Sequence, residues 1–360
     1  MLGFALGLVA LVLGAELLVR GASKLALSFG ISPLVVGLTV VAFGTSAPEM
    51  AVSVQSAWSG QVDIALGNVV GSNIFNVLFI LGVSALIVPL VVHQQIIRQE
   101  VPVMVGASLL LWALAADGGI SRWEGMLLAS LIVGYTFIII RQSRRETAAI
   151  RAEYDEAFDG GANGWDAHWG VQILLILAGL ALLVLGANWL VEAAVAFAKY
   201  LGVSELIIGL TIVAAGTSLP EVATSILAAI RGERDIAVGN VVGSNIFNIL
   251  CVLGISASVA PSDLIVAPAM LAFDLPVMVA AAVVCLPIFF SGNLVNRFEG
   301  VLFLVLYAAY TLYLFLYASS HALLDSYSLV MGSFVLPMLT LAVLMLAWQH
   351  WHSGGSGRGG

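Results

Sequence analysis

Charged residues are scarce in this 360-residue chain, in which Asp, Glu, Lys and Arg together make up 9%, whereas a soluble domain usually carries about a quarter. The chain has only two cysteines, Cys251 and Cys285, which lie in apolar stretches without the spacing of a disulfide framework or a metal–thiolate site. No basic patch supports nucleic-acid binding. No nucleophile–base pair or cofactor motif indicates an enzyme, so no cofactor is expected.

Long apolar runs dominate instead, since 61% of the residues are hydrophobic. Most runs exceed the roughly 20 residues that span a bilayer core, and they are continuous rather than alternating, which predicts membrane helices and not a barrel. No basic n-region or cleavage site marks residues 1–19, so they are expected to form a retained helix. The expected helices are 2–28, 31–58, 63–90, 98–116, 121–141, 169–200, 204–230, 235–260, 265–290, 296–318 and an additional span at 327–349.

An internal repeat organises these spans. Gly44–Gly82 aligns with Gly216–Gly254 without gaps at an offset of 172, and 25 of the 39 positions are identical. The repeat unit holds five helices, and because five is odd the second copy must enter the membrane from the opposite side. The predicted fold class is an all-α polytopic membrane protein with a 5+5 inverted-topology repeat plus one extra C-terminal helix. Its predicted segments are the first repeat (1–141), a polar loop (142–168), the second repeat (169–318), and the extra helix with a flexible tail (319–360).

The basic residues give an orientation for this arrangement. With the N-terminus outside, eleven of the 13 Lys and Arg residues fall at inner ends of the spans, and only Arg122 and Lys199 fall at outer ends. Inner loops of membrane proteins carry such an excess of positive charge. The sequence therefore predicts a multi-pass protein of the cell (inner) membrane, with the N-terminus outside and residues 142–168 in the cytoplasm.

The repeat contains a glutamate in the middle of an apolar run. Glu49 ends the motif Gly44-Thr-Ser-Ala-Pro-Glu49, and Glu221 ends the equivalent motif at 216–221. A carboxylate at that depth costs at least about 2.5–3.5 kcal/mol. A bound cation or proton is expected to offset this cost.

Polar groups accompany Glu49 on one face of its helix. Thr45 and Ser46 lie four and three residues before it, which is the spacing of helical neighbours. Pro48 removes a backbone donor, so the carbonyls from Ala42 to Gly44 are expected to be free to bind an ion. The second motif supplies the same pattern.

The next predicted helix adds the segment Gly67-Asn-Val-Val-Gly-Ser-Asn-Ile-Phe-Asn76. Ser72 and Asn76 share a face, and Gly67 and Gly71 form a small-xxx-small pair that favours close helix packing. The second repeat has equivalents of all four, namely Ser244, Asn248, Gly239 and Gly243. Two carboxylates among hydroxyls, amides and carbonyls suit hard cations such as Ca²⁺ or Na⁺ rather than Zn²⁺ or Cu⁺.

Each of these features alone is usually structural, as a kink or a packing contact, but their joint repetition favours an ion site. Other acidic residues have simpler explanations. Asp63 and Asp235 fall at helix starts, where an acid interacts favourably with the helix dipole. Glu100 and Asp274 precede prolines near helix starts, which indicates a boundary role. The acidic stretch 153–159 lacks the spacing of an EF-hand and is expected to be solvated.

The paired motifs resemble the α-repeats of the cation/Ca²⁺ antiporter superfamily, and most of all its bacterial sodium/calcium exchanger branch, over residues 1–318. The resemblance implies ten core helices, with ions bound between the second, third, seventh and eighth. It also implies that the first and sixth helices slide across that core to alternate access.

The resemblance places ligands at matching positions of both repeats. In the first these are Ala42 (through its carbonyl), Thr45, Ser46, Glu49, Ser72 and Asn76, and in the second Ala214 (through its carbonyl), Thr217, Ser218, Glu221 and Ser244. Some exchangers of this type carry Asp where this chain has Asn248. This core therefore holds two carboxylates rather than three, with Asn248 as a neutral candidate ligand. The span at 327–349 has no counterpart in the resemblance.

The predicted function is Ca²⁺/Na⁺ antiport across the lipid bilayer, because ions that share one pair of carboxylates exclude each other. Two negative charges balance one Ca²⁺, two Na⁺ or two protons. Antiport of Ca²⁺ against H⁺, or a K⁺-linked exchange, is the alternative. A cation channel and a purely structural membrane protein are further alternatives, although broken helices in an inverted repeat favour alternating access over an open path.

Overall fold

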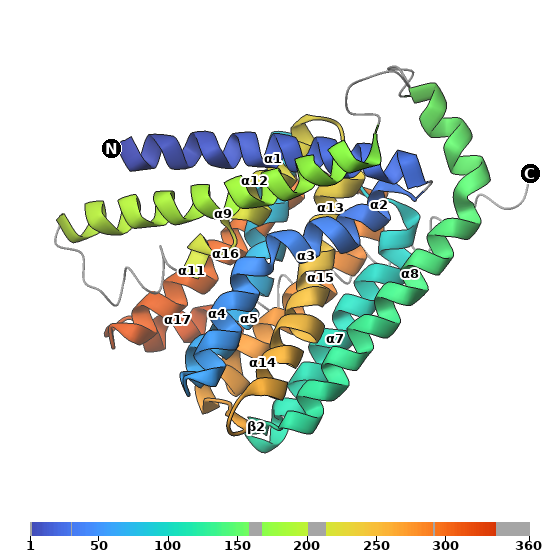
Figure 1. Cartoon of the computed structure of the whole chain (residues 1–360). Helices are drawn as coiled ribbons and strands as arrows, with labels where there is room; N and C mark the ends of the chain where they lie inside the picture. The colour runs from blue at the N-terminus through green and yellow to red at the C-terminus, as the bar shows by residue number, and fades with distance from the viewer. Residues whose placement is uncertain (1, 30, 158–167, 201–213, 291, 336–360) are drawn as a thin grey trace, which may run out of the picture.

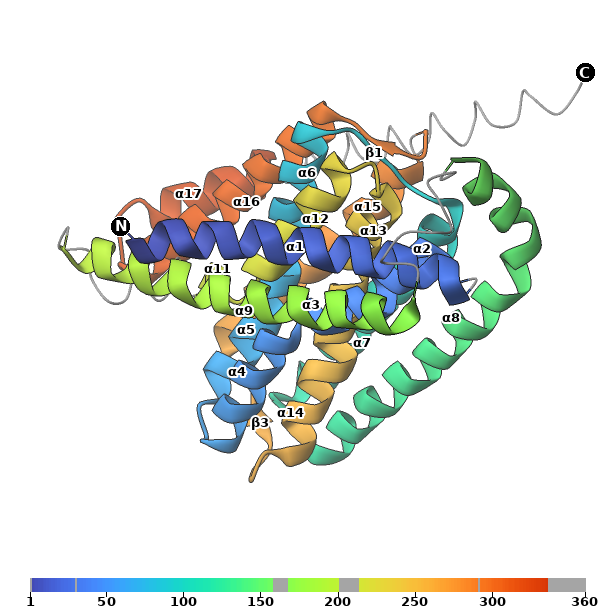
Figure 2. The ribbon, with the colours of Figure 1, turned by 45° about the horizontal axis from the view of Figure 1, so that its top comes forward.

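The computed structural model describes residues 2–29, 31–157, 168–200, 214–290 and 292–335. Helices account for nearly all of this part of the chain (Figure 1). Two long helices, α1 (Leu2–Phe29) and α9 (Trp169–Tyr200), lie side by side across the other helices in both Figure 1 and Figure 2. They are the first helices of the two predicted repeats.

The rest of the first predicted repeat consists of shorter helical pieces joined end to end. These are α2 (Pro33–Val36), η1 (Gly37–Val41), α3 (Ala42–Thr45), α4 (Ala47–Trp58), α5 (Val62–Phe75), η2 (Asn76–Ile80), α6 (Leu81–Ile87), η3 (Ile96–Glu100), α7 (Val101–Leu114), η4 (Ala115–Asp117) and α8 (Arg122–Ala157). The second span of this half, Pro33–Trp58, bends by 47° between α3 and α4.

The second half follows the same order. Its pieces are α11 (Ala214–Gly216), α12 (Leu219–Ile230), α13 (Arg234–Phe247), η6 (Asn248–Leu253), α14 (Gly254–Val259), η7 (Met270–Asp274), α15 (Leu275–Phe290) and α16 (Arg297–Ala318), followed by α17 (Leu324–Val330) and η8 (Met331–Val335). The π-helical turns η2 and η6 begin at equivalent positions, and so, within a residue or two, do η3 and η7. Such π turns inside helices often occur at functional sites.

Most of the predicted helices are present, with shifted boundaries. Within the described residues, eight helices are long and apolar enough to cross a membrane, and the bent pair Pro33–Thr45 and Ala47–Trp58 would make a ninth span. α12 is shorter than predicted because residues 201–213 lie outside the described part. Most of the predicted span at 327–349 lies outside it too, and α17 begins earlier, at Leu324.

Two predictions about connections need correction. Residues 142–157 were expected in a polar loop, but they continue α8 as one helix. Short strands were not predicted, yet β1 (Leu90–Val91) pairs antiparallel with β4 (Leu294–Val295), and β2 (Gly119–Ile120) pairs antiparallel with β3 (Leu264–Ile265). Each pair joins a connection of one half to a connection of the other. Two-residue strands leave no periodicity in the sequence, which explains why they were missed.

Glycines set the closest helix contacts. A Cβ added at Gly14 would lie 2.8 Å from the Gly179 carbonyl oxygen, and one at Gly7 would lie 2.9 Å from that of Gly186. Because residue number rises along α1 as it falls along α9, the two helices are antiparallel, as first helices of inverted repeats should be. Backbones that approach this closely gain dispersion contacts that lipid cannot supply.

The outer helices α8 and α16 dock in matching ways. Gly125 of α8 faces Gly254 of α14, and Gly300 of α16 faces Gly82 of α6, each with less than 3.2 Å between an added Cβ and the opposite backbone. The small-residue pair Gly239 and Gly243 of α13 likewise packs against the second span, where a Cβ at Gly243 would lie 2.9 Å from Leu38. Among the described residues, no atom lies within 4 Å of a Cβ added at its counterparts Gly67 and Gly71.

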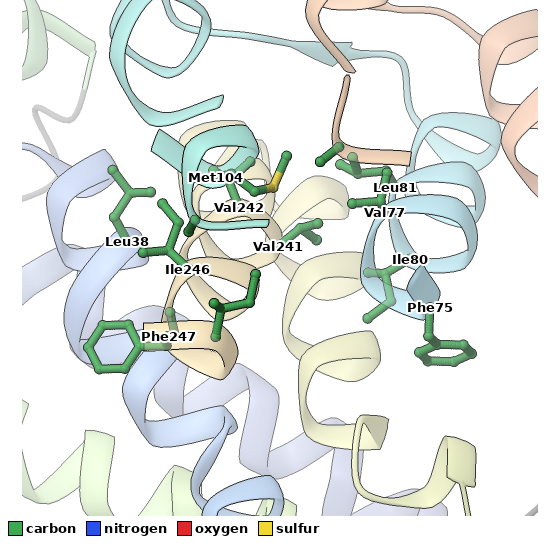
Figure 3. Close-up of a cluster of buried hydrophobic side chains, with 14 of the residues drawn as sticks. Leu38, Phe75, Val77, Ile80, Leu81, Met104, Val241, Val242, Ile246 and Phe247 are labelled. Atoms are coloured by element: carbon green, nitrogen blue, oxygen red, sulfur yellow. The ribbon is translucent and has the colours of Figure 1, made fainter. Parts of the chain in front are cut away.

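Apolar side chains fill the space around the crossing of the central helices. Figure 3 shows Leu38, Met104, Val241, Val242 and Ile246 grouped together on one side, with Val77, Ile80 and Leu81 on the other. α13 is the most enclosed span, since every residue from Ile236 to Phe247 is buried. This apolar shell surrounds most of the polar residues of the two motifs.

Candidate functional site

Both glutamates lie where a membrane helix is interrupted. The chain leaves helical geometry at Ser46 (ψ 8°) and at Ser218 (ψ 7°), and a new helix begins directly after each. Proline follows in the first turn of both new helices, where its missing N–H leaves no hydrogen bond unmade. Glu49 and Glu221 therefore sit in the first turn of α4 and α12, and the unpaired N–H groups there favour negative charge.

The predicted site residues are enclosed by the protein. Glu49 and Glu221 are both 0% exposed. Of the ten candidate side chains, nine are buried and only Thr217 is partly exposed. The buried nine are Thr45, Ser46, Glu49, Ser72, Asn76, Ser218, Glu221, Ser244 and Asn248.

Each glutamate accepts a hydrogen bond from a serine of the other repeat. Ser218 Oγ donates to Glu49 Oε1 at 2.8 Å, and Ser46 Oγ lies 3.0 Å from Glu221 Oε1. Ser218 Oγ also lies 3.1 Å from Ser72 Oγ. Two segments 172 residues apart in sequence thus meet at one place, and the two carboxylates belong to a single polar cluster.

The threonines of the motifs also reach across the repeats. Thr45 Oγ1 donates to Asn240 Oδ1 at 3.1 Å, and Thr217 Oγ1 donates to Asn68 Oδ1 at 3.2 Å. These asparagines in turn bind their own repeat: Asn68 Nδ2 donates to the Glu49 carbonyl oxygen at 3.1 Å and to Ser53 Oγ at 2.9 Å.

Asn240 repeats the arrangement of Asn68 in the second half. Its Nδ2 donates to the Glu221 carbonyl oxygen at 3.4 Å and to Ser225 Oγ at 2.9 Å. The two asparagines therefore fasten each broken helix to the helix that follows it.

Several oxygens of this cluster have no hydrogen-bond partner although they are buried. They are Glu49 Oε2, Glu221 Oε2, Asn76 Oδ1, Asn248 Oδ1 and Ser244 Oγ. A buried polar group without a partner costs about 1–3 kcal/mol, and a charged one costs more. Four of these five oxygens are equivalent pairs from the two repeats and are acceptors only, which is the donor set that a desolvated cation needs.

The expectation about the Ala42 carbonyl was wrong in one respect. Its oxygen is not free, because the Ser46 N–H donates to it at 3.1 Å and Thr45 Oγ1 lies within 3.4 Å. The broken helix closes with a tight turn that uses this acceptor. Ala214 begins α11 next to the undescribed segment. Ion binding by either carbonyl stays a prediction.

Sequence reasoning missed Asn68, Asn240, Asn73 and Asn245. Asn68 lies four residues before Ser72, so the same helical spacing that selected Ser72 and Asn76 would have selected it. Asn73 and Asn245 lie in the same identical stretch, and they bind the candidate ligands Asn76 and Asn248.

The remaining acidic residues are partnered away from the cluster. Glu100 is buried and accepts from Tyr135 Oη at 2.7 Å and from Gln95 Nε2 at 3.0 Å, while Asp274 accepts from Tyr310 Oη at 2.8 Å. Asp63 and Asp235 lie in the first turns of α5 and α13, where a negative charge interacts favourably with the helix dipole. In the described residues no three His, Cys, Asp or Glu side chains lie close enough to hold a metal ion together.

The comparisons with known proteins fit this geometry. Residues 1–141 and 171–316 match the family described as sodium/calcium exchanger protein. The chain is 34% identical over 347 residues to the sodium/calcium exchanger MaX1 of Methanosarcina acetivorans, covering 86% of this chain and 97% of that protein. It is 40% identical over 260 residues to the inner membrane protein YrbG of Escherichia coli, covering 72% and 79% of the two chains. Its fold superposes on the sodium-calcium exchanger NCX_Mj with a TM-score of 0.72 at 29% identity, over 86% of this chain and 97% of that one.

Proposed function

Because the chain belongs to the sodium/calcium exchanger protein family, we propose that it exchanges Ca²⁺ for Na⁺ across the membrane by alternating access. It is a multi-pass membrane transporter of cations and not an enzyme, and its ions are cargo rather than cofactors. The fold also supports a five-plus-five inverted repeat, in which the ion site lies where the two halves meet.

The unpartnered carboxylate oxygens of Glu49 and Glu221 carry this proposal. Each carboxylate is held through one oxygen by a serine hydroxyl, while its second oxygen is buried without a partner. Two formal negative charges in one enclosed cluster attract one Ca²⁺ or two Na⁺, together with neutral oxygens from Asn76, Asn248 and Ser244. Since one pair of carboxylates serves both ions, their binding is mutually exclusive, and exclusive binding at an alternately exposed site produces exchange.

The same oxygens support H⁺ as the second candidate counter-ion. A buried carboxylate without a cation is stabilised by protonation, so two protons can replace one Ca²⁺. The two functions differ in the gradient that drives uptake.

Purified protein in liposomes distinguishes them. We expect ⁴⁵Ca²⁺ uptake when the liposomes are loaded with Na⁺ and diluted into Na⁺-free buffer at equal pH on both sides. Uptake driven only by a pH gradient would replace Na⁺ with H⁺ in the proposal, and uptake indifferent to every imposed gradient would indicate a channel. K⁺-loaded liposomes test the K⁺-linked alternative in the same assay.

We also propose that the N-terminus lies outside. The excess of Lys and Arg at the inner ends of the spans supports it. The strand pairs fit the alternation of the spans in either orientation, because β1–β4 joins two connections on one side of the membrane and β2–β3 joins two on the other. A membrane-impermeant maleimide on intact cells tests it with Ser59→Cys and His93→Cys, both at exposed positions. Only Ser59→Cys should react before permeabilisation, and the reverse would invert the topology. The buried Cys251 and Cys285 serve as unreactive controls.

A further inference from the structure

Four asparagines meet where α5–η2 crosses α13–η6. Asn73, Asn76, Asn245 and Asn248 are each 2% exposed or less. Two hydrogen bonds join them across the repeats: Asn76 Nδ2 donates to Asn245 Oδ1 at 3.1 Å, and Asn248 Nδ2 donates to Asn73 Oδ1 at 3.1 Å. Each candidate ligand asparagine is therefore bound by an asparagine of the other repeat and not by its own neighbour three residues away.

The side chains of Asn73 and Asn245 are themselves fixed by groups that can only accept. Asn73 Nδ2 donates to the Asn245 carbonyl oxygen at 3.2 Å and to Met278 Sδ at 3.7 Å. Asn245 Nδ2 donates to the Asn73 carbonyl oxygen at 3.3 Å and to Met104 Sδ at 3.5 Å. A backbone carbonyl and a thioether accept hydrogen bonds and donate none. Both amides therefore must point their NH₂ group at the opposite backbone and their oxygen at the opposite ligand asparagine.

This arrangement sets the polarity of Asn76 and Asn248. Their NH₂ groups are used by Asn245 and Asn73, and their Oδ1 atoms are left buried without a partner. A flipped amide would place two oxygens against each other and would put an NH₂ group where the unpartnered oxygen now lies. An N–H donor repels a cation, whereas an amide oxygen ligates it.

We propose that Asn73 and Asn245 are positioning residues of the ion site, each of which orients the ligand asparagine of the other repeat so that its oxygen, and not its NH₂ group, faces the transported cation. The proposal rests on the proposed function, because it takes Asn76 and Asn248 as ligands. If Asn73 acted through packing alone, its substitution would change Ca²⁺ affinity to the same extent whether Asn248 of the other repeat or Asn76 of its own repeat had been replaced.

The test compares Asn73→Leu in two backgrounds. Leu has a similar volume but cannot accept the Asn248 NH₂ group, so the amide loses its fixed orientation. We expect the Ca²⁺ concentration for half-maximal uptake to rise roughly tenfold, which corresponds to a coupling of about 1.4 kcal/mol, with maximal rate nearly unchanged. In the Asn248→Asp background the same substitution should raise it less than about twofold, because both oxygens of a carboxylate accept and no orientation needs fixing.

The matched control is the pair within one repeat. Asn73→Leu should still cost about tenfold in the Asn76→Asp background, because Asn76 is oriented by Asn245 and not by Asn73. Ser84→Ala and Ser256→Ala remove buried hydroxyls from the same two spans, about two to three turns beyond the asparagines, and should leave the Ca²⁺ dependence unchanged. Equal effects of Asn73→Leu in all three backgrounds would overturn the proposal.

A second variant protects the test against misfolding. Asn73→Asp in its neutral carboxylic acid form keeps both an acceptor for the Asn248 NH₂ group and an O–H donor for the Asn245 carbonyl oxygen, so Ca²⁺ affinity should not fall, and a fall would contradict the positioning role. The Ca²⁺-induced rise in melting temperature of the purified protein gives a readout that needs no transport. If Glu49→Gln abolishes this rise while Asn73→Leu leaves its Ca²⁺ dependence intact, the proposed site stands and the positioning role fails. If Glu49→Gln leaves the rise unaltered, the proposed site itself fails.

Discussion

The contacts between the two repeats are nearly symmetric at the centre of the molecule, but the contacts of the α1–α9 pair with that centre are not. At the centre nearly every contact has its counterpart in the other half: Ser46 with Glu221 and Ser218 with Glu49, Thr45 with Asn240 and Thr217 with Asn68. The glycine contacts between α1 and α9 are equivalent in the two helices. The contacts that α1 and α9 make with the central helices are not equivalent.

The asymmetry appears at both broken helices. Gly44 faces Leu180 and Gly216 faces Val191, so both breaks lie against α9. α1 instead packs along α12, whereas within the described residues α9 makes no comparable contact with α4. An exact exchange of the halves would place α9 on α4. On the proposed alternating access, we infer that the ion cluster is common to two arrangements, of which this structure shows one, and that the α1–α9 pair differs between them.

The largest effect should come from removing either formal charge at the centre. Glu49→Gln and Glu221→Gln each leave a site of charge −1, which no longer balances Ca²⁺. Since losing a buried charge partner costs about 3–5 kcal/mol, we expect Ca²⁺ uptake into Na⁺-loaded liposomes to fall at least about 100-fold for each. The two variants should be equally impaired, because the centre is symmetric. Wild-type uptake by either variant would show that its carboxylate is not a ligand.

Substitution of Ser46 and Ser218, which donate hydrogen bonds to the carboxylates, should have a smaller effect on Ca²⁺ uptake. The difference between the two variants measures how far the two halves of the cluster differ. A hydrogen bond to a charged group contributes about 1.5–3 kcal/mol, so Ser46→Ala and Ser218→Ala should raise the Ca²⁺ concentration for half-maximal uptake about tenfold or more. Ser218→Ala should be the more damaging, since Ser218 also contacts Ser72 while Ser46 has no equivalent contact with Ser244. Melting temperatures without ions serve as the folding control. A larger effect of Ser46→Ala than of Ser218→Ala would contradict a functional role for the contact between Ser218 and Ser72.

The glycine contacts of the α1–α9 pair should matter for stability rather than for ion affinity. In Gly14→Ala the new Cβ would lie 2.8 Å from the Gly179 carbonyl oxygen and 2.8 Å from the Leu183 backbone nitrogen, and overpacking of this kind costs about 1–3 kcal/mol. We expect a lower melting temperature and an unchanged Ca²⁺ dependence of the remaining uptake. Gly134→Ala in α8 is the matched control, because no atom lies within 4 Å of its added Cβ. Equal melting temperatures for both variants would contradict the close approach of α1 and α9.

The sequence predicted the symmetric part of this molecule well and the asymmetric part not at all. Identical residues at a fixed offset identified the two motifs, and helical spacing selected Thr45, Ser46, Glu49, Ser72 and Asn76, all of which are buried in one half of the cluster. Partners across the repeats could not be predicted, because an offset shows that segments are equivalent without showing which atoms meet.

The two-residue strand pairs and the helical continuation of α8 past residue 142 were missed because local composition does not determine them. The position of the α1–α9 pair could not be predicted for a different reason. Equivalent sequences in the two halves do not show on which half the pair packs, and only non-equivalent residues can favour one side.

One such non-equivalent contact is the ion pair between Glu16 of α1 and Arg231 at the end of α12. Arg231 Nη2 and Nε lie 2.7 and 3.0 Å from Glu16 Oε2. The equivalent positions in the other half are Asn188 and Ser59, which cannot form an ion pair. The pair therefore stabilises only the arrangement in which α1 packs on α12.

Its contribution should be the smallest of those considered, because both side chains are substantially exposed, at 35% and 57%. Exposed pairs contribute about 0.2–1 kcal/mol, which shifts a two-state population about 1.4- to 5-fold. Glu16→Asn copies the residue of the other half, and it should move the distance distribution between spin labels on α1 and α12 toward the longer component. The shift should shrink at high salt, since salt screens exposed charges. The exchanged pair Glu16→Arg with Arg231→Glu should restore the original distribution. If neither substitution changes the distance distribution, packing alone selects the observed arrangement, and the ion pair does not contribute to the position of the α1–α9 pair.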